Sequence, residues 1–173
     1  MNSLFSKKLV IVLVIVVLAS VVGVGLFMSK ITSQKPIQQP ELTLNLVPTN
    51  QTVQLNQSME VVMSVDAGNF DVSFVDFTLA YDKDRLNLES FAPSANFNVP
   101  ILTQLDNSGI FRVVLGNNST NKLTGNVEVG TLHFKGISAG DGILNLSAKE
   151  VTVRTNPPSD IATKPTQTVL KVK

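Results

Sequence analysis

Two patterns of hydrophobic positions divide the chain near residue 40. Residues 9–28 are uncharged and almost entirely apolar, whereas from Glu41 onward apolar and polar residues alternate in short segments. Twenty apolar positions in a helix span the roughly 30 Å hydrocarbon core of a membrane. A period of two places successive side chains on opposite faces of a strand. The sequence therefore predicts a membrane-spanning helix followed by a β domain.

The apolar segment is predicted to be an uncleaved, single-pass transmembrane anchor. Lys7 and Lys8 stand immediately before it, and basic residues that flank a membrane helix tend to stay in the cytoplasm. Residues 1–8 are therefore expected inside the cell and residues 41–173 outside it. This topology places the protein in the cell membrane with an extracellular C-terminal domain.

Two alternatives for the N-terminus predict different mature proteins. A cleaved signal peptide would use Ala19 as the small residue before the cut, but the apolar run continues for ten residues beyond Leu18. A type IV pilin-like helix normally carries a glutamate within the run, and this run has no acidic residue. Residues 29–40 are polar, contain two prolines and are predicted to form an extended linker.

The alternating region predicts short strands and no helix. Asn, Gly, Pro and Asp separate the apolar segments, as is typical of turns between strands. Many strands without helices imply an all-β fold, a two-sheet antiparallel sandwich or jelly roll. The predicted strands are 42–47, 52–55, 59–67, 72–81, 86–91, 101–105, 110–115, 127–137, 142–148, 150–154 and 168–172.

The two-residue period also assigns side chains to faces, most clearly in the strand at residues 72–81. The set expected to face the core is Val75, Phe77, Leu79 and Tyr81. The opposite set provides the candidate partner-binding residues Phe74, Asp76 and Thr78, because an exposed Phe beside an Asp suits a protein interface. The alternative is that a loop covers Phe74 and that Asp76 only solvates the sheet. The segment at 110–115 alternates poorly and could bury either face.

The residue types present disfavour catalysis. The chain has no cysteine and a single histidine, His133, on a predicted outward position, and no Gly-x-Ser-x-Gly turn occurs. Asp82 and Asp84 lack the other ligands of a calcium loop, so we interpret residues 82–85 as a turn. The sequence thus predicts a non-enzymatic domain without cofactor or metal.

Charge and aromatic content narrow the possible partners. From Glu41 onward there are ten Lys and Arg against thirteen Asp and Glu, a balance of −3, with no basic run. This balance argues against nucleic-acid binding. Tryptophan is absent and Tyr81 is the only tyrosine, which disfavours a glycan platform built from stacking aromatic rings.

Several segments resemble the cohesin family. The stretch VSFVDFTLAYDKDRLNLESF at 72–91 matches its most recognisable motif, an alternating strand that ends in Tyr81-Asp82, a short turn, and a Leu that leads into the next strand. MEVVMSVDAG at 59–68 resembles the family's early strand, and residues 125–153 resemble its later block of alternating strands and Gly turns. The resemblance covers nearly all of residues 41–173.

What the resemblance implies is a receptor for a dockerin, a small Ca²⁺-loaded helical domain supplied in trans by another secreted protein, such as a polysaccharide-degrading enzyme. Asp76 matches an Asp that helps to bind dockerins, whereas Phe74 stands where well-known members have Asn. Lys83 also replaces a common proline in the turn. A surface module that binds carbohydrate directly, or a structural adhesion domain, is the alternative because a fold alone does not determine function.

Overall fold

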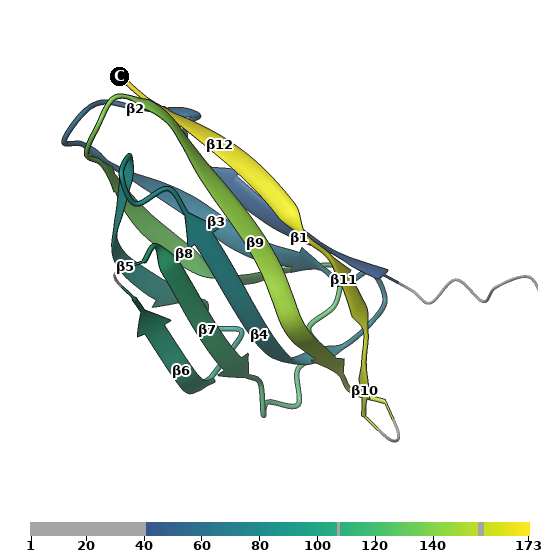
Figure 1. Cartoon of the computed structure of the whole chain (residues 1–173). Coiled ribbons are helices and arrows are strands. Elements are labelled where there is room, and N and C mark those ends of the chain that lie inside the picture. Colours follow the sequence, from purple (N-terminus) through teal and green to yellow (C-terminus); the bar gives the residue numbers. More distant parts are fainter. Residues whose placement is uncertain (1–40, 107, 156–157) are drawn as a thin grey trace, which may run out of the picture. The chain divides into compact units, whose positions relative to one another are not determined.

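The computed structural model describes residues 41–106, 108–155 and 158–173, which form one compact unit of strands and turns (Figure 1). No helix among these residues is long and apolar enough to cross a membrane. The predicted anchor at residues 9–28 and the linker at residues 29–40 lie outside the described residues.

Two packed sheets make up the described part of the chain, as the sequence predicts. One has the strand order β11-β1-β3-β8-β5, and the other has the order β2-β12-β9-β4-β7-β6, with β10 beside β9. The strands are β1 (Glu41–Pro48), β2 (Thr52–Val53), β3 (Ser58–Asp66), β4 (Val72–Tyr81), β5 (Leu86–Pro93), β6 (Val99–Leu105), β7 (Ile110–Gly116), β8 (Asn126–Gly136), β9 (Gly140–Val153), β10 (Ser159–Asp160), β11 (Ala162–Lys164) and β12 (Thr166–Val172).

The core lies between the two sheets and is built by the alternation that the sequence shows. Val75, Phe77 and Leu79 of β4 are at most 1 % exposed, so the predicted inward face of this strand is confirmed. Tyr81 at its end packs edge-on against Phe134 of β8, with ring centroids 5.3 Å apart. Within the described residues, the buried side chains from Leu42 to Val172 form one hydrophobic cluster, so this domain has a core of its own.

Strand β9 corrects one detail of the prediction. Residues 142–148 and 150–154 were expected to be two strands, but residues 140–153 form one strand with a bulge. Asp76 of β4 pairs with Glu150 and Phe77 pairs with Ala148, so Lys149 is the extra residue. A bulge of one residue reverses the alternation, and the sequence pattern breaks at the same point.

The C-terminal segment changes sheets at a proline. Strand β11 pairs in parallel with β1 of the first sheet, and β12 pairs antiparallel with β9 of the second. Only Pro165 separates the two strands. Because proline has no N–H to donate to a ladder and has a fixed φ, it suits a crossing point between sheets. Strands β10 and β11 were missed by the prediction because two or three residues are too few to show a period.

Candidate binding face

Four neighbouring strands of the second sheet, β9, β4, β7 and β6, lie side by side and turn one face away from the core (Figure 1). Phe74, Asp76 and Thr78 alternate along β4 with core residues, so all three predicted site residues lie on this outer face. We call the outer surface of these four strands the binding face. Contact of the three residues with a partner stays a prediction.

Asp76 is held by an ion pair with a residue that sequence reasoning missed. The Arg112 Nε donates to Asp76 Oδ1 at 2.8 Å, and Arg112 Nη2 donates to Oδ2 at 2.6 Å. Asp76 is only 4 % exposed, so the alternative interpretation, that it merely solvates the sheet, is wrong. The hydrogen bonds from Arg112 hold the pKa of the Asp76 carboxyl below its usual value, and Asp76 in turn raises the pKa of Arg112.

The poor alternation of residues 110–115 explains why Arg112 was missed. Phe111, Val113 and Leu115 of β7 enter the core, as alternation would require. Val114 lies on the opposite face but is also buried, at 6 % exposed, opposite Asp76 and Leu102 in the strand pairing. Because this strand has buried apolar residues on both faces, its sequence does not show a clear two-residue period.

Phe74 occupies an apolar end of the binding face. Phe74 is half-buried and pairs with Gly116 of β7. Because Gly116 has no side chain, no β7 side chain stands at this position between Phe74 and strand β6. The nearest side-chain atoms around the glycine are those of Val99 and the exposed Ile101 of β6. This end of the face therefore combines an aromatic ring with exposed aliphatic surface, as protein interfaces often do.

Thr78 lies between two shallow hollows in the described surface. One, of about 230 Å³, lies over β4, β9 and β12 and is lined by small or uncharged residues that include Ala80, Ser147 and Pro165. The other, of about 130 Å³, lies over β4, β6 and β7 and is lined by Thr78, Gln104, Asp106, Ile110 and Arg112. We call the second one the Arg112 hollow.

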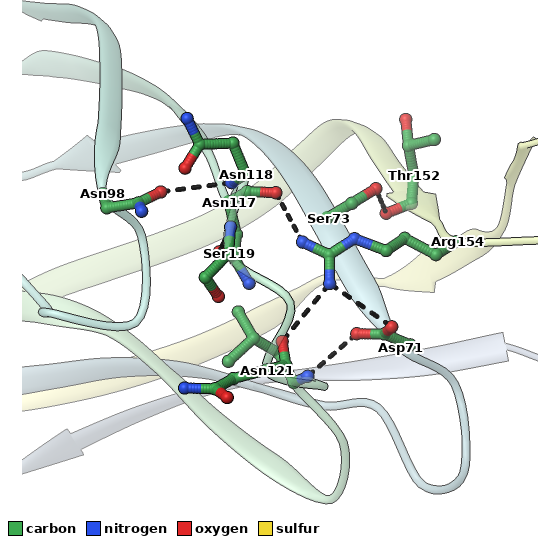
Figure 2. A network of polar contacts seen from close by, with 10 residues as sticks. Asp71, Ser73, Asn98, Asn117, Asn118, Ser119, Asn121, Thr152 and Arg154 are labelled. Carbon is green, nitrogen blue, oxygen red and sulfur yellow. Dashed lines mark hydrogen bonds and ion pairs between the residues drawn. The ribbon is translucent and has the colours of Figure 1, made fainter.

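A second polar network ties the loop between β7 and β8 to the end of β9 (Figure 2). The guanidinium of Arg154 donates to the main-chain carbonyls of Asn117 and Asn121, at 2.6 and 3.2 Å, and lies 3.4 Å from Asp71 Oδ2. Asp71 Oδ1 accepts the N–H of Leu123 at 2.8 Å. These contacts satisfy loop backbone groups, so we assign this network a structural role.

The other residues that could serve in catalysis or metal binding do not lie together. His133 of β8 lies beside Glu60 of β3, with Nδ1 and Oε1 3.8 Å apart. The chain has no cysteine that this histidine could activate. Asp82 accepts the N–H of Asp84 and shapes the predicted turn. Among residues 41–106, 108–155 and 158–173, no group of three His, Asp or Glu side chains could hold a metal ion.

Comparison with known proteins identifies the fold. No protein-family model and no curated protein sequence matches the chain. Solved structures do match. The seventh ScaB type I cohesin of Pseudobacteroides cellulosolvens aligns with a TM-score of 0.65 at 14 % identity, over 77 % of this chain and 92 % of its own. The cohesin module of a Clostridium perfringens family 33 glycoside hydrolase aligns with a TM-score of 0.62 at 12 % identity, over 78 % and 97 %.

A third match was solved with a partner bound. The sixth cohesin of scaffoldin B from Acetivibrio cellulolyticus, in complex with a Cel5 dockerin mutant, aligns with a TM-score of 0.60 at 18 % identity, over 77 % of this chain and 98 % of its own. The described residues are therefore a β-sandwich of the cohesin-like class. More particularly, the chain has the fold of the cohesin modules, at 12 to 18 % identity to these three.

Proposed function

We propose that this chain is a membrane-anchored, extracellular and non-catalytic receptor for a dockerin-type domain of a secreted protein. The observation that carries the proposal is the binding face, a four-strand surface with an apolar end, a bidentate ion pair and two hollows on a cohesin-like fold. The Acetivibrio cohesin, which has the same fold, holds a dockerin in its solved structure. The apolar run at residues 9–28 and the preceding lysines support the anchor.

The charges on the binding face favour a protein partner recognised mainly by shape and hydrogen bonds. The Asp76 and Arg112 charges cancel within one bidentate pair, and the hollow beside Ala80 and Ser147 has no charged lining residue. A glycan platform, by contrast, would need exposed flat aromatic rings, and the chain has no tryptophan.

The proposal is tested by binding assays with purified, Ca²⁺-loaded dockerin modules from the same organism. Wild-type protein should retain at least one dockerin only when Ca²⁺ is present, because the cation belongs to the partner. Thr78→Arg places a large charged side chain at the centre of the binding face and should abolish retention. Thr131→Arg, at an equally half-buried outward position of β8 on the other sheet, is the matched control and should bind normally.

Three results would overturn the proposal. If none of the organism's dockerin modules is retained, the partner is not a dockerin. Retention of polysaccharide regardless of Ca²⁺ would replace the proposal with direct glycan binding. Equal binding by Thr78→Arg and the control would move the site away from the binding face. Protease added to intact cells tests the anchor separately, since the β domain should be removed from the outer surface.

A further inference from the structure

The Arg112 hollow offers a specific hydrogen-bonding pattern to a partner side chain. Thr78, Arg112 and Gln104 lie opposite one another on β4, β7 and β6 and form one row across the binding face. Asp106 lies just beyond the end of β6, and Ile110 supplies an exposed apolar wall. The hollow therefore brings together a guanidinium, a carboxylate and an aliphatic surface.

Arg112 presents a fixed donor to this hollow. Its Nε and Nη2 are both occupied by Asp76, which fixes the plane of the guanidinium because the two bonds are parallel. Its third nitrogen, Nη1, has no hydrogen-bond partner among the described residues, and the side chain is 37 % exposed. A donor oriented in advance loses little side-chain entropy when a partner binds.

Asp106 presents a fixed acceptor on the other side. Its Oδ1 accepts hydrogen bonds from the Ser108 N–H at 2.9 Å, the Ser108 hydroxyl at 2.7 Å and the Ile110 N–H at 2.9 Å. Those bonds keep the pKa of Asp106 below its usual value. Its Oδ2 has no hydrogen-bond partner within the part of the chain that the structure describes.

Charge and size restrict what can occupy the hollow. A partner carboxylate would meet the Asp106 carboxylate, and Arg112 is already paired with Asp76. A partner ammonium could pair with Asp106, but it has no acceptor for the free Arg112 Nη1 donor. A neutral group that both accepts and donates avoids both conflicts. A volume of about 130 Å³ corresponds to roughly four water molecules, which is the size of a four-atom side chain such as that of asparagine.

We propose that the Arg112 hollow binds the primary amide of an Asn or Gln side chain on the protein partner, with the amide oxygen accepting from Arg112 Nη1 and the amide nitrogen donating to Asp106 Oδ2. This proposal rests on the proposed function, because the partner is the dockerin-type domain. The affinity of the hollow for a primary amide can nevertheless be measured without that partner.

The first test is an NMR titration of the β domain, residues 41–173, with acetamide, acetate and methylammonium as separate probes. Acetamide should shift the backbone resonances of Gln104, Ile110 and Arg112 and bind about tenfold more tightly than either ion, the factor that one charge-assisted hydrogen bond supplies. Equal or tighter binding of an ion, or no shift at these residues with any probe, would overturn the proposal.

Two variants separate recognition from folding. Gln104→Phe fills the hollow from an exposed position and leaves the Asp76–Arg112 pair intact, so it should abolish acetamide binding in a domain that melts normally. Asp106→Asn keeps the Oδ1 acceptor that holds the turn but replaces the Oδ2 acceptor with an amide N–H₂ donor. It should weaken acetamide binding about tenfold, the loss of one hydrogen bond to a charged group. Undiminished acetamide binding in either folded variant would refute the assignment.

Binding to a dockerin then tests whether the partner uses the hollow. If wild-type protein binds a dockerin and Gln104→Phe binds it equally well, the amide proposal fails while the proposed function stands. If no dockerin binds at all, the proposed function fails, and the acetamide titration still decides the chemistry of the hollow. In a dockerin that binds, substitution of the responsible Asn or Gln by Ala should reproduce the loss seen with Gln104→Phe.

Discussion

The ion pair between Asp76 and Arg112 should respond unequally to loss of its two members. Asp76 has a side chain that is 6 % exposed, whereas that of Arg112 is 37 % exposed. Arg112→Met keeps the aliphatic stem over Asp76 but leaves a buried carboxylate without a charged partner. Asp76→Asn leaves a guanidinium that still reaches water. The first substitution should therefore destabilise the domain more than the second.

The magnitudes follow from burial. Removing one member of a fully buried pair costs about 3 to 5 kcal/mol, and the partial exposure of Arg112 reduces the expected cost of Arg112→Met to about 2 to 3 kcal/mol. Asp76→Asn keeps a hydrogen-bond acceptor of the same shape and should cost about 1 kcal/mol. The double variant should be no less stable than Arg112→Met, with a coupling energy of about 1 kcal/mol or more.

Urea denaturation of the four proteins at neutral pH measures these differences. The pH dependence adds a second readout, because the folded-state pKa of Asp76 is lower than its unfolded value of 3.8. Its contribution to stability is fully present above that pH and is lost as the pH falls through the lower folded value. Asp76→Asn should remove this part of the acid sensitivity. Equal costs for the two single substitutions, or a coupling energy below about 0.5 kcal/mol, would refute the assignment of a buried carboxylate.

Three further substitutions test other parts of the domain. Gly130→Ala should cost more than about 1 kcal/mol, since its Cβ would lie 2.5 Å from the Phe91 ring; Gly116→Ala, with contacts of 3.6 Å or more, is the tolerated control in the same thermal melts. Arg154→Met should cost about 1 to 3 kcal/mol and raise hydrogen exchange in residues 117–125; unchanged exchange would contradict its structural role. Phe74→Ala should weaken dockerin binding by about 1 to 3 kcal/mol, and unchanged affinity in the folded variant would exclude Phe74 from the interface.

The fold was predictable because a two-residue period along most of β4 and β8 distinguishes buried from outward positions. The same reasoning failed where the period breaks. The bulge at Lys149 divides one strand into two apparent ones, and the very short strands β10 and β11 contain too few residues to show any alternation. Local pattern determines element type, whereas bulges and sheet changes depend on pairing with strands distant in sequence.

The candidate site was predictable only in part, for a related reason. Phe74, Asp76 and Thr78 follow from the period of a single strand, but the residue that fixes Asp76 lies 36 positions away on β7. Nothing in the sequence indicates that two residues so far apart form an ion pair. The poor alternation of β7 also fails to show that Arg112 faces outward. Electrostatic partners across a sheet are therefore visible only once the strand order is known.

Burial of Asp76 changes how the binding face should be tested. An Asp that is 4 % exposed and occupied by two hydrogen bonds has little carboxylate surface left for a partner. Its substitution would alter binding chiefly by releasing Arg112, so a loss of affinity in Asp76→Ala would not identify a contact residue. Arg112, Thr78 and the surrounding hollow are the groups that a partner can reach. Variants that change the exposed surface while leaving the ion pair in place, such as Gln104→Phe, separate direct recognition from support of the sheet.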